Sequence, residues 1–368
     1  MLFYAILFFI IFILTFIEVI SPIKIKKRIV LSMLSILFCV SGFRYLGGSD
    51  LYLYEEGYNS VPYLFSMEFV DYIGTIESHF WEPGFLVFIS FWKSVFNLSF
   101  YGLLLIVALL FYVCLYVGYK RYSVHWGILL MFFMYKLFFY ETFVAMRQQI
   151  SICLFFLIMH LVEERKLLKY YLLCAFVVFP FHYGSAILFL VYFVNKIKIT
   201  KERFLYTGLL LLPFAFLPPI FSSILQPIMT FLSEDKGTAY LSGDEMQSMF
   251  YTLETYLVWF LIYRNYDGIT KGYVHAEFMI KLFLIILPCV TIFRDVVILR
   301  REMDYFYLCI PVLIGYICNV NLRYKRVIIL VMAFVCFYGY MRYLTNFDNG
   351  GFVPYKSWIE LPGASITQ

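Results

Sequence analysis

The sequence predicts an all-α, polytopic integral membrane protein with about twelve transmembrane helices, forming a single transmembrane domain over residues 1–368. Of the 368 residues, 63% are hydrophobic and 14% are charged, whereas soluble domains carry about 25% charged residues. Apolar runs of roughly 20 residues recur along the chain, and about 20 helical residues cross a hydrocarbon layer of about 30 Å. Too few polar side chains remain to cover a water-soluble surface, so the composition excludes a soluble fold.

Clusters of Lys and Arg separate the apolar runs and indicate which loops face the cytoplasm. The positive-inside rule then predicts twelve spans, with both ends of the chain outside. The predicted spans are 2–20, 29–43, 100–119, 125–141, 147–162, 170–181, 184–195, 204–222, 252–268, 275–293, 303–320 and 327–343.

Two parts of this pattern need separate interpretation. The run at 2–20 has no charged segment before it and no small-residue cleavage site after it, so it is predicted as a retained span. The runs at 170–181 and 184–195 are short, and Pro180 and Gly184 interrupt the helical pattern between them. They form either a hairpin of short helices or one broken span.

Three stretches are predicted to face the outside: the loop 44–99, the loop 223–251 and the tail from Thr345. Within the first, residues 84–97 have the pattern of a helix lying at the membrane interface. The eight cysteines all lie in apolar runs without metal-ligand spacing, so neither disulfides nor a zinc site are predicted. The net charge of +5 is attributed to topology and not to nucleic-acid binding.

Several charged residues fall outside the cytoplasmic clusters, at the outer ends of predicted spans. They are Arg44, Arg147, Arg294, Arg300 and Arg301, with Asp50, Glu82, Glu141 and His182 at similar depth. Each arginine could simply pair with a nearby acid, such as Arg44 with Asp50 or Arg147 with Glu141. Five arginines converging on one face instead indicate an anionic ligand, because the guanidinium fork suits phosphate oxygens.

His182 lies in the segment Phe-Pro-Phe-His-Tyr-Gly-Ser, a polar break in an apolar stretch. It either satisfies a backbone carbonyl or acts as a proton-transfer or phosphate-binding group. The other candidates for proton transfer are His79, Glu82 and Asp50, and His125, His160 and His275 are predicted boundary residues near cytoplasmic span ends. No Gly-rich phosphate loop, metal-ligand helix motif or serine nucleophile elbow is present, so no metal and no cofactor are predicted.

Short motifs follow one another in a defined order across most of the chain. They are Arg44-Tyr-Leu-Gly-Gly-Ser-Asp50-Leu-Tyr52-Leu-Tyr54, Glu82-Pro83-Gly84-Phe85, Met146-Arg147-Gln148-Gln149-Ile150-Ser151, Phe181-His182-Tyr183-Gly184-Ser185, Arg301 before Asp304-Tyr305-Phe306, and Pro354-Tyr355-Lys356. This ordered set resembles the EpsG-like branch of the Wzy family of polysaccharide (O-antigen) polymerases. Residues 204–300 match no motif of that family, so acceptor and sugar specificity stay open.

The resemblance implies a metal-independent glycosyltransferase with a multi-span (GT-C-like) architecture, located in the cell inner membrane with its active site facing the periplasm. Such an enzyme transfers a growing glycan from undecaprenyl diphosphate onto the non-reducing end of a lipid-linked repeat unit, in lipopolysaccharide or exopolysaccharide synthesis. The implied partners are undecaprenyl diphosphate-linked oligosaccharides as donor and acceptor, membrane lipids and a chain-length regulator protein. No cofactor and no nucleic acid are implied.

Residue roles follow from the motif positions. The expected catalytic residues are Asp50, Glu82 and His182; the expected diphosphate ligands are Arg44, Arg147, Arg300 and Arg301; and the expected sugar contacts are Tyr52, Tyr54 and Tyr183. The favoured arrangement has an acidic base, Glu82 or Asp50, with His182 beside the diphosphate, and His182 is the competing base.

Three other classes of protein fit parts of this pattern. An O-antigen ligase would use the same lipid-linked donor, and a lipid-linked oligosaccharide flippase or transporter would also need a basic cavity. A transporter is expected to show internal repeats, and the chain shows none. A membrane O-acyltransferase would place a histidine in the membrane but would not need several outward-facing arginines.

Overall fold

The computed structural model describes residues 1–45, 47, 50–74, 81–217, 248–348, 350–361 and 365–367. Within these ranges the chain is helical, and its strand-like pairing consists of two isolated bridges, Arg44 with Ser357 and Leu98 with Thr367. The predicted all-α fold class is therefore confirmed. Most of the predicted outer loop 223–251, and the candidate His79, lie outside the described residues.

The chain divides into two compact units. Unit 1 comprises Met1–Ala186 and Leu330–Gln368, and unit 2 comprises Ile187–Ile329. The helices of unit 1 are α1 (Leu2–Ile20), α2 (Ile23–Gly42), α3 (Leu51–Ser60), α4 (Met67–Gly74), α5 (Pro83–Phe96), α6 (Phe100–Tyr119), α7 (Trp126–Lys136), α8 (Met146–Glu163) and α9 (Leu167–Leu173). Those of unit 2 are α10 (Leu188–Lys196), α11 (Lys201–Leu211), α14 (Met249–Gly272), α15 (Ala276–Thr291), α16 (Val297–Glu302) and α17 (Cys309–Val320). The division falls within α18 (Lys325–Phe347).

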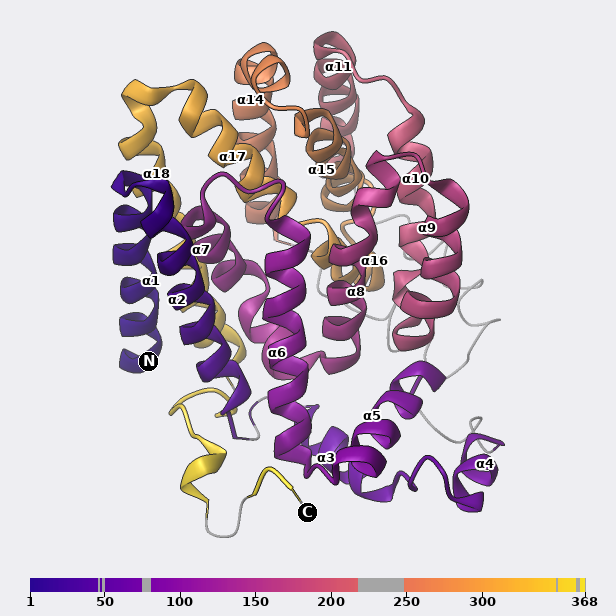
Figure 1. Cartoon of the computed structure of the whole chain (residues 1–368). Helices are drawn as coiled ribbons and strands as arrows, with labels where there is room; N and C mark the ends of the chain where they lie inside the picture. Colours follow the sequence, from indigo (N-terminus) through magenta and orange to yellow (C-terminus); the bar gives the residue numbers. More distant parts are fainter. Residues whose placement is uncertain are drawn as a thin grey trace. The chain divides into compact units, whose positions relative to one another are not determined.

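Helix α6 is the centre of unit 1, where it packs against α8 and α2 while α1 packs against α7 (Figure 1). The approach of α6 to α8 is close, because a Cβ atom at Gly118 would lie 2.5 Å from the carbonyl oxygen of Phe156. Glycine is therefore required at this crossing. In unit 2, α14 and α15 each pack against α17.

Four described helices are long and apolar enough to cross a membrane. They are Leu2–Ile20, Phe100–Tyr119, Met146–Glu163 and Leu322–Phe347. A fifth span results if the pair Leu299–Tyr305 and Cys309–Val320, bent by 50°, is counted as one. These helices identify an integral membrane protein, and the count of twelve spans stays a prediction.

Two predicted spans differ from the helices that form. The span predicted at 303–320 begins with a 3₁₀ turn, Met303–Tyr305, and its α-helix starts only at Cys309. Pro311 lies in the first turn of that helix, where a missing N–H is tolerated. The span predicted at 125–141 is interrupted at Leu137 and ends in a π-helical turn, Tyr140–Val144.

The polar break lies where the sequence predicts it. Helix α9 continues through a π turn, Cys174–Val178, into a 3₁₀ turn, Phe179–Phe181, and His182 follows in extended backbone. A second 3₁₀ turn, Tyr183–Ile187, leads into α10. Pro180 lacks an N–H for the helix ladder, which is why the turn tightens and ends there.

The described residues of the outer loop 44–99 form three α-helices, whereas the sequence predicts only one, at 84–97. That helix forms as α5, and α3 and α4 precede it. Figure 1 shows α3 and α5 at the lower end of α6, in the same unit. One core cluster joins α3, α5, α6 and α8 through side chains that include Tyr58, Phe85, Leu104 and Ile150. Burial of these apolar side chains stabilises the helices of the loop against α6 and α8.

Candidate functional site

Glu82 is held at the start of α5 by the geometry of its neighbours. It is the residue before the first turn, and Pro83 begins the helix with a backbone angle that is already helical. Gly84 packs against the 3₁₀ turn that precedes His182, because a Cβ atom there would lie 2.7 Å from the Pro180 carbonyl oxygen. This close approach brings the Glu82 carboxylate, which is 6% exposed, to the polar break.

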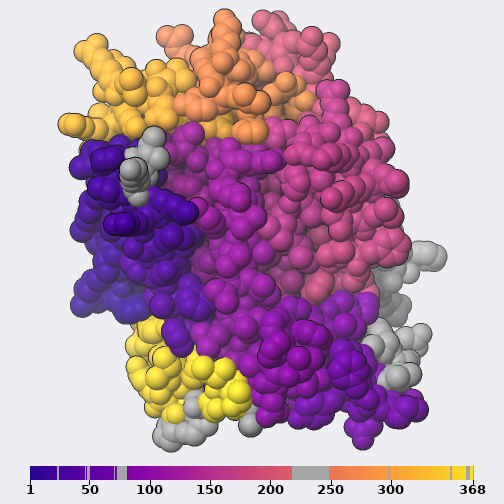
Figure 2. Space-filling model, in the orientation of Figure 1, coloured from indigo at the N-terminus to yellow at the C-terminus, as the bar shows by residue number. Residues whose placement is uncertain are grey.

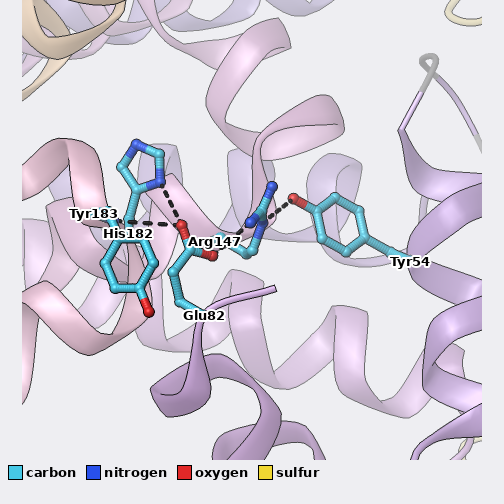
Figure 3. A network of polar contacts seen from close by, with 5 residues as sticks. All are labelled: Tyr54, Glu82, Arg147, His182 and Tyr183. Carbon is cyan, nitrogen blue, oxygen red and sulfur yellow. Dashed lines mark hydrogen bonds and ion pairs between the residues drawn. The ribbon is translucent and has the colours of Figure 1, made fainter. Parts of the chain in front are cut away.

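Arg147 reaches Glu82 from the first turn of α8. Its Nη1 atom lies 2.5 Å from Glu82 Oε2, and its Nε atom donates a hydrogen bond to the Tyr54 hydroxyl oxygen at 3.1 Å (Figure 3). The guanidinium carbon also lies 6.0 Å from the centre of the Tyr54 ring. Arg147 therefore has an acid partner, Glu82, which lies 65 residues away in the sequence.

The second carboxylate oxygen of Glu82 faces the polar break. Glu82 Oε1 lies 3.5 Å from His182 Nδ1 and accepts a hydrogen bond from the Tyr183 backbone N–H at 3.3 Å (Figure 3). The carboxylate thus links Arg147 and His182, which come from separate helical segments. Of the ten residues with a predicted role, five meet here: Tyr54, Glu82, Arg147, His182 and Tyr183.

The charges in this network set the protonation state of Glu82. Burial by itself would raise the pKa of the carboxyl group, but the contact with His182 and the charge of Arg147 outweigh it and lower the pKa to about 2. Glu82 is therefore ionised at neutral pH and is a weak base. Burial raises the pKa of the Tyr54 hydroxyl, which stays protonated beside Arg147.

A shallow apolar groove of about 460 Å³ begins next to the network. Pro83 and Phe181 line it, and each is adjacent in sequence to a network residue. Phe88 and Phe176 also line the groove, and Phe176 is 75% exposed. The groove is therefore an apolar surface that begins at residues adjacent to the Glu82 network.

The remaining predicted site residues take other positions. Arg44 is buried beside the Phe143 ring and, in the described part of the chain, has no carboxylate at ion-pair distance, so the alternative pairing with Asp50 is wrong. Asp50 lies at the start of α3, one turn before Tyr54, whose backbone N–H donates to the Asp50 carbonyl oxygen. The exposed Tyr52 lies on the same helix.

Arg300 and Arg301 lie in the last turn of helix α16 of unit 2, and the buried Arg294 precedes that helix. The Arg294 guanidinium donates to the Leu217 carbonyl oxygen at 3.0 Å. The convergence of these three arginines with Arg44 and Arg147 stays a prediction. No group of three or more His, Cys, Asp or Glu side chains with metal-ligand geometry occurs in the part of the chain that the structure describes.

Trp81, which packs against Tyr54 of the network, is not among the residues predicted from the sequence. Trp81 stacks on Tyr54 with ring centres 5.6 Å apart and an angle of 27° between the rings. A Cβ atom at Gly57 would overlap the Trp81 ring, so this glycine makes room for the indole. The available signal was position, because Trp81 immediately precedes the motif that begins at Glu82.

The fold and the site define a helical integral membrane protein with a partly buried Arg–Glu–His network beside an apolar groove. A family model described as the EpsG family matches residues 27–357, a range that includes every motif from Arg44 to Lys356. The chain therefore belongs to the EpsG family, and it is a membrane polysaccharide polymerase of the glycosyltransferase type. No curated protein and no solved structure matches the chain.

Proposed function

We propose that this polymerase transfers a growing glycan from undecaprenyl diphosphate onto the non-reducing end of a lipid-linked repeat unit, at the periplasmic face of the inner membrane. The observation that supports this reaction best is the Glu82 carboxylate that joins Arg147 to His182. A fixed guanidinium suits a diphosphate, and an imidazole suits proton transfer. The transfer of a sugar from a lipid diphosphate to a hydroxyl group uses both groups, because the diphosphate gains negative charge and the hydroxyl group loses a proton.

In the proposed reaction, a hydroxyl group of the acceptor sugar attacks the anomeric carbon of the donor. The bond between that carbon and the diphosphate oxygen breaks, and its electron pair leaves with the diphosphate. The hydroxyl proton passes to His182, and the new glycosidic bond forms. Arg147 stabilises the diphosphate as its negative charge increases, so the stabilisation is greater in the transition state than in the ground state.

The lowered pKa of Glu82 decides how we divide the catalytic roles between Glu82 and His182. Because the pKa of Glu82 is lowered to about 2, this carboxylate is a poor proton acceptor at neutral pH. We assign it as the group that orients Arg147 and His182 and stabilises the imidazolium that forms, and we assign His182 as the base. This reverses the arrangement favoured by the sequence, in which an acid is the base and His182 lies beside the diphosphate.

The apolar groove fits the lipid part of the donor. Its lining includes the residues adjacent to Glu82 and His182, together with exposed aromatic side chains such as Phe176. An isoprenoid chain placed there would extend from the diphosphate into the surrounding lipid. A twelve-span, GT-C-like architecture and a chain-length regulator as partner complete the proposal.

The test uses purified protein with lipid-linked repeat units, and the products are resolved by length on a gel. We expect a ladder of products that persists in EDTA, because Arg147 supplies positive charge that a cation would otherwise supply. Loss of the ladder in EDTA, with recovery in magnesium or manganese, would contradict metal independence. In cells, deletion should leave surface polysaccharide with a single repeat unit; absence of all surface polysaccharide would instead indicate a flippase or ligase.

A further inference from the structure

A second cavity of unit 1, about 520 Å³ in volume, lies apart from the Glu82 network. Its lining is mainly aromatic and includes Tyr4, Tyr45, Tyr52, Tyr140, Phe143 and Tyr343. The volume falls within the range of about 300–1,000 Å³ that is usual for small-molecule sites. Flat apolar rings combined with tyrosine hydroxyls match sugar rings, which present C–H groups on their faces and hydroxyl groups at their edges.

One wall of this cavity is the C-terminal segment, which is fixed in place by hydrogen bonds. The Tyr4 hydroxyl donates to the Phe352 carbonyl oxygen at 2.9 Å, and the Tyr355 hydroxyl donates to the Val40 carbonyl oxygen at 3.0 Å. The Tyr45 N–H donates to the Lys356 carbonyl oxygen at 2.8 Å. Figure 2 shows the yellow C-terminal residues packed against the indigo and purple segments of the same unit. The cavity is therefore a preformed site.

Two positively charged residues lie close to the aromatic residues of the cavity: Arg44, next to Phe143, and Lys356 in the lining. Arg44 is 2% exposed, and its guanidinium carbon lies 5.3 Å from the centre of the Phe143 ring. Nη1 of Arg44 donates to the Ser41 carbonyl oxygen, whereas its Nε atom is buried without a hydrogen-bond partner among the described residues. Burial lowers the pKa of Arg44 to about 10, so the group stays protonated at neutral pH. Together with Lys356 in the lining, Arg44 places two positive charges at this cavity, against the one negative charge of Asp348, whose carboxylate accepts a hydrogen bond from the Phe352 N–H at 2.7 Å.

The cavity adjoins the proposed reaction site through α3. Tyr52 lines the cavity and Tyr54 contacts Arg147, and residues two apart in a helix point to nearly opposite sides. The cavity and the network therefore lie on different sides of α3. Val144 in the cavity lining is also only three residues before Arg147.

We propose that this cavity binds sugar residues of a negatively charged glycan, and that the bound glycan is the acceptor. The aromatic walls stack on the sugar rings, and Arg44 and Lys356 favour anionic groups on the glycan. The assignment to the acceptor rests on the proposed function. The binding of a charged glycan does not depend on it and is tested separately.

The test measures ligand binding by saturation-transfer NMR, with purified full-length protein in a detergent that has no sugar headgroup. The probes are trigalacturonate as an acidic glycan, maltotriose as a neutral glycan of the same length, and inorganic diphosphate as an anion without a sugar. At low salt, trigalacturonate should bind more tightly than maltotriose. Tyr52→Ala should weaken the binding of both sugars by roughly threefold to tenfold. Lys356→Gln should weaken the binding of trigalacturonate alone.

Matched controls are Tyr63→Ala and Lys27→Gln, which change exposed side chains outside the cavity lining and should bind as the wild type does. Failure of both sugars to bind, or unchanged binding by Tyr52→Ala, would overturn the glycan site. Equal affinity for the two sugars would overturn its charge preference. If inorganic diphosphate alone binds, the cavity is an anion site and the glycan assignment is wrong.

The acceptor assignment has its own readout. A variant at the reaction site, Arg147→Lys, should retain glycan binding while losing polymerisation, and Tyr52→Ala should raise the acceptor concentration needed for half-maximal polymerisation. If glycan binding holds but the acceptor dependence of Tyr52→Ala is unchanged, the cavity binds glycan in another role. Failure of the proposed polymerase reaction would leave the binding results standing.

Discussion

Glu82 interacts with groups from two separate segments of the chain: the Arg147 guanidinium on one side, and the His182 ring with the Tyr183 backbone N–H on the other. A buried carboxylate with these partners is ionised, and removing it would leave the partly buried Arg147 without its acid. Motif spacing identified all of these residue types as candidates. The sequence could not show which of these residues pair. Arg147, the nearest network residue outside the loop 44–99, lies 65 residues from Glu82.

The first prediction concerns pH and stability. The pKa of Glu82 is lowered from 4.5 to about 2 in the folded protein. The ionised carboxylate therefore stabilises the folded state fully above pH 4.5, and this stabilisation is lost as the pH falls towards 2. The shift corresponds to about 3 kcal/mol. Thermal unfolding in detergent should show a steeper loss of stability below pH 4.5 for the wild type than for Glu82→Gln. Parallel curves would mean that this carboxyl group has an ordinary pKa.

The second prediction concerns the geometry of the guanidinium. Arg147→Lys keeps the charge but loses the planar fork, so the rate of chain lengthening should fall by about a hundredfold while the protein level stays normal. His182→Ala should lose activity to a similar degree if this ring accepts the proton.

The matched control for the arginine is Arg121→Lys. Arg121 is exposed and forms an ion pair with Glu164 at 3.2 Å on the surface of unit 1, where such pairs contribute little. We expect its polymer length to match the wild type. Normal polymer from both Arg147→Lys and His182→Ala would reduce the network to a structural ion pair.

At the scale of elements, α3 and α5 place the site residues by capping and close packing. Lys93 of α5 donates to three carbonyl oxygens at the C-terminal end of α3, those of Tyr58 at 3.1 Å, Asn59 at 3.3 Å and Val61 at 2.9 Å. A cation at this end of a helix satisfies its unpaired carbonyl groups and matches the helix dipole. The cap joins the helix that contains Tyr54 to the helix that Glu82 precedes.

The third prediction tests the packing of α5 on the polar break. Gly84→Ala would place a methyl group 2.7 Å from the Pro180 carbonyl oxygen, and backbone cannot move aside as a side chain can. We expect a loss of about 1–3 kcal/mol in stability and a marked loss of polymerisation, because Glu82 moves with the helix. Gly272→Ala, at a position with no neighbouring atom within 4 Å, is the control and should be neutral. Equal behaviour of the two variants would argue against this contact.

At the scale of the whole molecule, the orientation in the membrane decides which face holds the chemistry. The fourth prediction uses single cysteines in a Cys39→Ser background, since Cys39 is exposed and the other seven cysteines are buried. A cysteine at Ser248, within the predicted outer loop 223–251, should react with an impermeant maleimide added from outside. One at Lys198, in a basic cluster, should not. The opposite pattern would place the Glu82 network at the cytoplasmic face.

Composition alone determined that this chain folds as helices in a membrane. A mainly apolar sequence with few charges has too few polar side chains to form a water-exposed surface, and helices satisfy the backbone hydrogen bonds within the lipid. The order of the motifs determined the family, and Pro180 determined where the polar break falls. Only the tertiary structure decided that Glu82 pairs with both Arg147 and His182, and that Arg44 is buried away from any described carboxylate. It also built the aromatic cavity from both ends of the chain, with Tyr4 bonded to Phe352 across 348 residues. The physical reason is that hydrophobic periodicity reports which face of a helix is buried, whereas side-chain partners depend on which helices pack together.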